Sequence, residues 1–194
     1  MTFAERIKDH FSDNIQTAIL IADSMSEQIA HAGELLSDCI LKGGKILVCG
    51  HGGNANLAQY FSTQLLDCFE MERPALPAID LTNTSVITSI ASHGNYQQVF
   101  SKQINALGRE NDILVVICDT EVEENLVEAV TTAHEKNISV ISLCGTEKNK
   151  LTTLCKDQDI SLCVPSDRVP RIRESHMLIL HCLSDVIDKC LFGV

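Results

Sequence analysis

The sequence predicts an α/β fold, in which a five-stranded parallel sheet is covered by helices on both faces and preceded by a helical extension. Five short apolar runs alternate with helical patterns, and a glycine turn follows the first run. Strands that alternate with helices form βαβ units, whose crossovers are right-handed and whose strands are parallel. The chain of 194 residues suffices for one such domain over residues 1–194 and is too short for two comfortable domains.

The first 41 residues form the predicted helical extension. From Phe3 to about Leu41 the apolar residues recur at helical spacing, and only Gly33 interrupts them, which predicts one long helix or two joined helices. The apolar stripe of this extension needs a surface that buries it. A helix from another copy of the chain is the simplest such surface, so we expect a homo-oligomer.

The five apolar runs define the expected strands. They read KILVC, LPAID, DILVVIC, SVISLC and DISLCV, at 45–49, 76–80, 112–118, 139–144 and 159–164. Because the runs are apolar on both faces, helices should cover both sides of the sheet. In such sheets ligands bind at the carboxyl ends of the strands. The last segment, Arg171 to Leu191, is an amphipathic helix that follows Pro165 and Pro170.

Charge and cysteine content exclude several classes of function. The net charge of -11 and the pI near 5.0 argue against direct binding of nucleic acid, which needs clustered Lys and Arg. The nine cysteines form no C-x-x-C pair and match no zinc spacing, so we interpret them as core thiols of a cytoplasmic protein. No apolar run is long enough to cross a bilayer, and the amino terminus lacks the features of a signal peptide, so we expect no membrane association.

The turn CGHGGN, residues 49–54, is the first candidate for a binding site. Gly52, Gly53 and Asn54 lie where a strand passes into a helix, and the free N–H groups of a helix start attract phosphate. The alternative is a tight turn without a ligand. The turn matches neither the dinucleotide fingerprint G-x-G-x-x-G nor a P-loop with its lysine.

Three further segments make the chain resemble a known family. They are ERPALPAIDL at 72–81, FSKQINALGRENDILVVI at 100–117 and RIRESHMLILHCLSDVIDKCLF at 171–192. Together with the turn they resemble the sugar isomerase (SIS) domain proteins of the phosphoheptose isomerase group over essentially the whole chain. The resemblance implies a flavodoxin-like sheet of strand order 2-1-3-4-5 and a homotetramer.

The group has two branches with different functions. One contains isomerases that convert sedoheptulose 7-phosphate to a heptose 7-phosphate, a precursor of lipopolysaccharide. The other contains DnaA initiator-associating proteins of the DiaA type, which keep the fold without an established isomerase role. The tail HMLILHCLSDVIDKCLF is more similar to the DiaA branch.

The resemblance also locates the positions where enzymes of the group hold zinc. They use a His and a Glu on the helix after the glycine turn, and a Gln and a His on the last helix. Those positions are Tyr60, Gln64, Arg173 and His181 here. Only His181 keeps a ligand type, and Gln64 cannot serve as the catalytic base. We therefore expect Gln64 and His181 to be degenerate positions of a former catalytic site, with no catalytic residue and no bound metal. Zinc is expected as a cofactor only if the isomerase alternative holds.

The loop after the third strand holds the phosphate in this group and is rich in Ser and Thr. Here it reads CDTEVEEN, residues 118–125, in which only Thr120 keeps a hydroxyl. Its four acids place up to four negative charges where a phosphate dianion would lie: Asp119, Glu121, Glu123 and Glu124. Alternatively, these acids favour the start of the next helix. The expected ligand cleft is lined by Gly52, Gly53, Asn54, Asp119, Thr120 and Glu121.

These observations predict a non-catalytic adaptor of the DiaA type that binds the replication initiator DnaA as a homotetramer. Leu191 and Phe192 are the candidate partner surface, with packing against the domain as the alternative. The other functions left open are a phosphoheptose isomerase and a module that binds a sugar phosphate, or an unphosphorylated or amino sugar, in the cleft. We expect His93 to be solvated. His176 and His181 are five residues apart and do not share a helix face.

Overall fold

The computed structural model describes residues 1–145 and 149–193, and its five strands form one parallel sheet. The strand order is β2-β1-β3-β4-β5, so the predicted order is confirmed. The strands are β1 (Ile46–Gly50), β2 (Ala78–Asp80), β3 (Ile113–Ile117), β4 (Ser139–Cys144) and β5 (Ile160–Cys163). β4 has the predicted bounds, whereas β2 is two residues shorter at its start than the sequence predicts.

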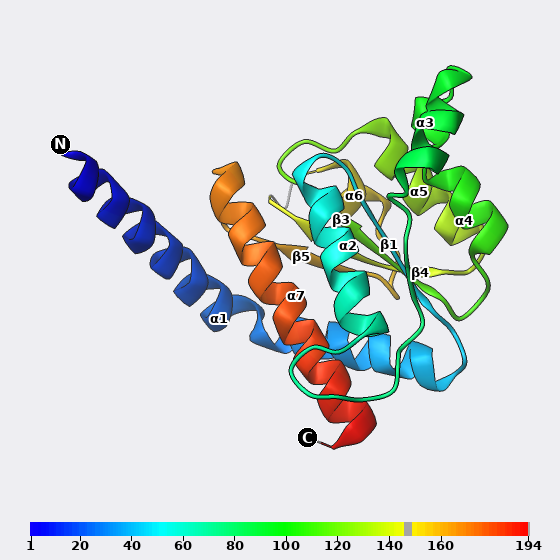
Figure 1. Ribbon diagram of the computed structural model, residues 1–194, viewed down its shortest axis with the longest axis horizontal. Helices are drawn as coiled ribbons and strands as arrows, with labels where there is room; N and C mark the ends of the chain where they lie inside the picture. Colours follow the sequence, from blue (N-terminus) through cyan, green and yellow to red (C-terminus); the bar gives the residue numbers. More distant parts are fainter. Residues whose placement is uncertain (146–148, 194) are drawn as a thin grey trace.

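Helices cover the sheet in two layers (Figure 1). They are α1 (Phe3–Leu41), α2 (Gly53–Leu66), α3 (Thr84–Ser92), the 3-10 helix η1 (Tyr96–Gln98), α4 (Ser101–Leu107), α5 (Glu124–Glu135), α6 (Lys150–Leu154) and α7 (Val169–Phe192). One apolar core lies between the sheet and α1, α2 and α7. The second lies between the sheet and the layer that contains α4 and α5. The central strands β1 and β3 are buried at every residue, which explains their continuous apolar sequences.

The amino-terminal extension is one continuous helix of 39 residues, α1. It begins with a capping box, in which Thr2 and Glu5 each accept a hydrogen bond from the other's backbone N–H. Its second half crosses α7 at Gly33, where a Cβ atom would lie 2.5 Å from Cγ1 of Val186. Its first half projects from the body of the molecule (Figure 1) and exposes a stripe made of Phe3, Ile7, Phe11, Ile15 and Ile19.

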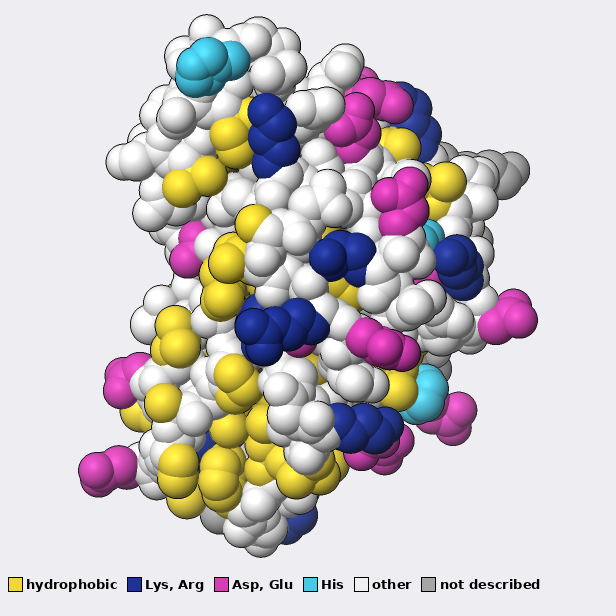
Figure 2. Space-filling model, turned by 90° about the vertical axis from the view of Figure 1, so that its right-hand side faces the viewer, with side chains coloured by type: hydrophobic (Ala, Val, Ile, Leu, Met, Phe, Trp, Pro, Cys, Tyr) yellow, Lys and Arg dark blue, Asp and Glu magenta, His cyan; other side chains and the backbone are white. Residues whose placement is uncertain are grey.

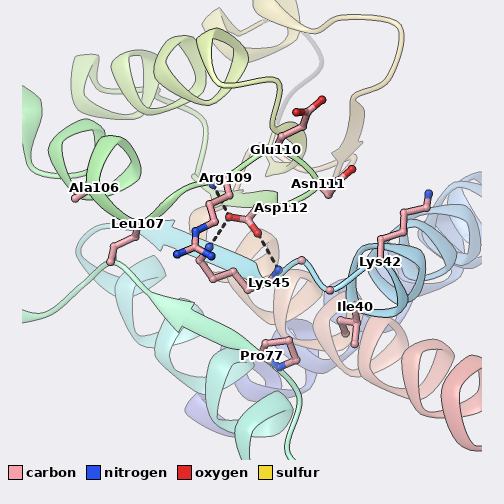
Figure 3. Close-up of a pocket in the computed structure, with 12 residues that line it drawn as sticks. Ile40, Lys42, Lys45, Pro77, Ala106, Leu107, Arg109, Glu110, Asn111 and Asp112 are labelled. Carbon is pink, nitrogen blue, oxygen red and sulfur yellow. Dashed lines mark hydrogen bonds and ion pairs between the residues drawn. The ribbon is translucent and has the colours of Figure 1, made fainter.

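A buried ion pair links the amino ends of β1 and β3, at the end of the sheet opposite the expected site. Lys45 Nζ lies 2.6 Å from Oδ2 of Asp112, and Asp112 also accepts hydrogen bonds from the backbone N–H groups of Lys45 and Arg109. These contacts line a hollow of about 530 Å³ (Figure 3). Because Asp112 is buried and satisfied by these donors, we interpret it as a structural link between the strands.

The charged side chains do not form a single acidic surface on the face that Figure 2 shows, where Lys and Arg are interspersed with Asp and Glu. The nine cysteines are all free thiols. Within residues 1–145 and 149–193, no helix has the length and apolar character that a membrane span requires.

Candidate functional site

A cavity of about 380 Å³ opens at the carboxyl ends of β1 and β3. It lies between the start of α2, the loop after β3 and the start of α7. Its lining residues are His51, Gly52, Asn54, Cys118, Asp119, Thr120, Glu121, Glu123, Val169 and Arg173. The structure thus brings together five of the six predicted cleft residues, and the sixth, Gly53, contacts Arg173 directly.

The start of α2 is shaped for close approach of another group. Gly52 has a φ of 59°, in the left-handed region that favours glycine, and α2 has no hydrogen bond from a capping side chain. A Cβ atom at Gly53 would lie 2.6 Å from Nη1 of Arg173, so the guanidinium lies directly on this turn. Asn54 is buried, and its side-chain oxygen has no hydrogen-bond partner in the described part of the chain.

Arg173 binds Asp119 through two hydrogen bonds. The distances are 2.5 Å from Nη2 to Oδ2 and 3.2 Å from Nε to Oδ1. The hydrogen bond to Asp119 raises the pKa of the Arg173 guanidinium. Arg173 is therefore a fixed cation in the cavity wall, 54 residues away in sequence from its carboxylate partner.

Two other acids of the loop also lie beside basic side chains. Nε2 of His51 lies 2.7 Å from a carboxylate oxygen of Glu123, and Nζ of Lys150 lies 2.9 Å from one of Glu124. With Asp119 bound to Arg173, three of the four acids are paired, and Glu121 alone makes no ion pair among the described residues. Two of the four acids thus face a side chain that carries a fixed positive charge, Asp119 with Arg173 and Glu124 with Lys150.

Two further expected positions, Tyr60 and His181, meet on the seam between α2 and α7, away from this cavity. The Tyr60 hydroxyl lies 3.0 Å from Nε2 of His181, and the two rings contact edge to face. Phe69 flanks the same imidazole, with ring centroids 5.5 Å apart. One turn along α2, Gln64 is buried and accepts a hydrogen bond from the Ser184 hydroxyl at 3.3 Å. His181 thus lies along the seam and does not line the cavity at the glycine turn.

The four positions where the group's enzymes hold zinc do not form a zinc site in this chain. Arg173 is bound to Asp119, and Gln64 is bound to Ser184. A guanidinium cannot donate an electron pair to a metal, and zinc prefers imidazole, thiolate and carboxylate. In the part of the chain that the structure describes, no group of three or more His, Cys, Asp or Glu side chains has an arrangement that could hold a metal ion. The residues present do not fit zinc.

His176 lies beneath the site and is fully buried. Burial lowers the pKa of its imidazole to about 4, while the backbone of Cys144 and the charge of Asp119 partly oppose this shift. His176 is thus a neutral core residue at physiological pH. His93 ends α3 on the exposed surface, where its Nδ1 lies 2.8 Å from the carbonyl oxygen of Ser89.

Comparison with known protein families decides the classification. The SIS domain family profile matches residues 10–145 of this chain. A phosphoheptose isomerase from Alkalilimnicola ehrlichii is 45% identical, and the alignment covers 97% of both chains. The chain belongs to the phosphoheptose isomerase family of SIS domain proteins.

Other relatives and solved structures agree over the full length. A phosphoheptose isomerase from Dechloromonas aromatica is 42% identical, with 100% of both chains covered. The structure of a phosphoheptose isomerase from Francisella tularensis matches with a TM-score of 0.93 at 43% identity, over 97% of this chain and 100% of that one. The phosphoheptose isomerase GmhA from Neisseria gonorrhoeae matches with a TM-score of 0.90 at 39% identity, over the same shares.

These comparisons overturn the prediction of a DnaA-binding adaptor. Full-length relatives that match at 42–45% identity are named phosphoheptose isomerases, and so are the two solved structures that match at 39–43% identity. The proposed DnaA surface loses its basis with that prediction. Leu191 packs against the core, and Phe192 is partly exposed at the end of α7.

The sequence interpretation missed two pairs that shape the site. His51 was not recognised as the partner of Glu123, and Arg173 was interpreted only as a lost zinc ligand. One signal in the sequence could have revealed these pairs. The loop is rich in acids, and Arg173 and His51 are basic residue types at positions that the fold brings to the same end of the sheet.

Proposed function

We propose that the protein is a phosphoheptose isomerase, which interconverts sedoheptulose 7-phosphate and an aldoheptose 7-phosphate. The observation that carries the proposal is the cavity at the start of α2. It holds the guanidinium of Arg173 and the imidazole of His51 beside a helix start that has no side-chain cap. This combination suits a phosphate, and relatives that bear the name of this enzyme align with the whole chain.

In this proposal the substrate phosphate lies at the start of α2. Arg173 donates to the phosphate oxygens, and the positive end of the α2 dipole adds a further attraction for the anion. Thr120 and Asn54 line the same cavity and supply a hydroxyl and an amide. The side-chain oxygen of Asn54, buried without a described partner, is then available to a sugar hydroxyl.

The sugar chain then extends along the seam between α2 and α7, toward Tyr60 and His181. Contacts of Gly53 with Arg173, of Tyr60 with His181, and of Gln64 with Ser184 show that the two helices run side by side in the same direction. Tyr60 follows Gly53 by seven residues, two helical turns or about 10 Å, on nearly the same side of α2.

The hydrogen-bonded pair of Tyr60 and His181 supplies the proton transfer. An aldose–ketose isomerase removes a proton from one of two adjacent carbons and returns it to the other, while a second proton moves between their oxygens. The imidazole of His181 accepts the carbon-bound proton, and the Tyr60 hydroxyl exchanges a proton with the oxygens of the enediol. Gln64 can donate a hydrogen bond to a hydroxyl but takes no proton. The reaction is a balanced rearrangement without an oxidant.

We propose that these side chains act without a bound metal, because Tyr60, Gln64 and Arg173 are unsuited to zinc. We also propose that the protein works as a homotetramer in the cytoplasm. The apolar stripe on the first half of α1 supports assembly, since five large apolar side chains are exposed there: Phe3, Ile7, Phe11, Ile15 and Ile19. Free thiols are consistent with a reducing compartment.

The test is turnover of sedoheptulose 7-phosphate by the purified full-length protein, followed by NMR in the presence of a chelator. Tyr60→Phe should lower kcat by about 100-fold or more, because it removes the general acid. Tyr96→Phe is the matched control, since Tyr96 is the other tyrosine of the chain and lies exposed on η1, away from the seam. Binding of the sugar phosphate without turnover would instead support the binding-module alternative.

A further inference from the structure

The carboxylate of Asp119 lies where an anion is expected to bind. It accepts two hydrogen bonds from Arg173, with the shorter, 2.5 Å, from Nη2. The side chain of Asp119 is 18% exposed and that of Arg173 is 41% exposed, so the pair lies at the mouth of the cavity and is accessible to solutes. This bidentate pairing of a guanidinium with a carboxylate has the same geometry as a guanidinium bound to two oxygens of a phosphate.

The position of the guanidinium is built into the fold. Gly53 leaves room for it on the first turn of α2, because a Cβ atom there would lie 2.6 Å from Nη1 and 2.7 Å from Cζ. No side chain caps this turn, whose N–H groups at Asn54 and Ala55 donate to the carbonyl oxygens of His51 and Gly52, so the positive end of the helix dipole faces the cavity. The neighbouring Asn54 is 4% exposed and has an unpartnered side-chain oxygen within the described structure, which is a second observation that points to a ligand here.

The geometry points to Asp119 as an internal competitor for the phosphate of the substrate. The carboxylate holds Arg173 in place while the site is free, and a sugar phosphate binds by displacing it from the guanidinium. This inference rests on the proposed function, because it concerns the same phosphate position.

The competition selects the kind of anion that the site accepts. Each ligand must break the ion pair of Asp119 with Arg173 and then bind beside the displaced negative charge. Inorganic phosphate makes contacts only at the start of α2, whereas a sugar phosphate also makes hydrogen bonds along the seam toward Tyr60. The extra contacts offset the displacement of Asp119. The site therefore discriminates against the free phosphate of the cell while binding phosphorylated sugars.

Asp119→Asn tests the inference, because it keeps the shape of the side chain and removes its charge. Binding of inorganic phosphate and of sedoheptulose 7-phosphate is measured by isothermal titration calorimetry at low ionic strength. The variant should bind both anions about tenfold more tightly than the wild type, with the larger gain for inorganic phosphate. Glu121→Gln is the matched control, since Glu121 lines the same cavity and forms no ion pair with a described residue. It should gain only about two- to threefold, from general charge removal.

A double variant separates competition from simple charge removal. In an Arg173→Gln protein the change Asp119→Asn should give no more gain than Glu121→Gln gives, because there is no guanidinium to release. Circular dichroism of each variant checks that it is folded. Equal or weaker binding by Asp119→Asn, with measurable binding by the wild type, would overturn the inference and leave the proposed function intact. If neither anion bound to the wild type or to Asp119→Asn, both would be overturned.

Discussion

Acidification from pH 8 to pH 5 is expected to lower the free energy of unfolding by about 2 kcal/mol through one side chain, His176. Its imidazole is fully buried, and burial lowers its pKa from 6.5 to about 4. Above pH 6.5 the residue is neutral in both states and has no effect. Between about pH 6.5 and pH 4 the unfolded chain binds a proton that the folded chain excludes, so stability falls as the pH falls. At pH 5 protonation of His176 stabilises the unfolded chain by about 2 kcal/mol more than the folded chain.

The assay is equilibrium unfolding in urea at several pH values and one fixed protein concentration, for the wild type and for His176→Leu. The substitution changes the absolute stability, but only the difference in pH dependence is compared, so other titrating groups cancel. The wild type should lose about 2 kcal/mol more than the variant between pH 8 and pH 5. Parallel curves for the two proteins would show that the folded protein accommodates the charged imidazole, and the reasoning about burial would fail.

Three further predictions concern packing and assembly. Gly33→Ala should destabilise the protein by about 1–3 kcal/mol, seen as a lower thermal midpoint, because its Cβ would meet Val186; an unchanged midpoint would mean that α1 and α7 separate easily. Asp188→Ala should lower the free energy of unfolding in urea by about 3–5 kcal/mol, because it leaves the buried Arg73 guanidinium without its anion. In the wild type Nε of Arg73 lies 2.7 Å from Oδ1 of Asp188, and a loss below 1 kcal/mol would contradict this reasoning. Phe11→Glu should dissociate the oligomer in light scattering without unfolding it, and an unchanged mass would exclude this stripe as the interface.

The sheet could be predicted because its sequence signals are local. β1 and β3 are buried at every residue, and the corresponding apolar runs are continuous and end at glycine or polar residues. The start of β2 was harder to place, because LPAID contains a proline and the backbone pairs with β1 only from Ala78. Ladder pairing, more than apolar character, decides where such an edge strand begins.

The pairings in the site could not be predicted in the same way. Asp119 meets Arg173 across 54 residues, and His51, after β1, meets Glu123, in the loop after the neighbouring strand β3. The first contact depends on how α7 packs beside α2 and the second on the pairing of β1 with β3, and no local pattern encodes either. The residue types at these positions were correctly identified, but their charges were considered separately, and this produced an apparent excess of negative charge.

The incorrect adaptor prediction came from treating lost zinc ligands as a lost function. The structure shows that the substituted residues have specific partners: Tyr60 contacts His181, Gln64 accepts from Ser184, and Arg173 binds a carboxylate. Site positions that no longer serve a function would not need side chains with such specific partners.

We propose that the side chains of this chain move a proton between adjacent carbons of a heptose phosphate without a metal. It is tested most directly by incubating the chelator-treated protein with sedoheptulose 7-phosphate in D₂O and measuring deuterium incorporation by NMR. We predict deuterium at C1 of the recovered ketose and at C2 of the aldose product, because the abstracted proton exchanges with solvent at the base. Absence of deuterium in both sugars, or incorporation only after zinc is added, would contradict the account.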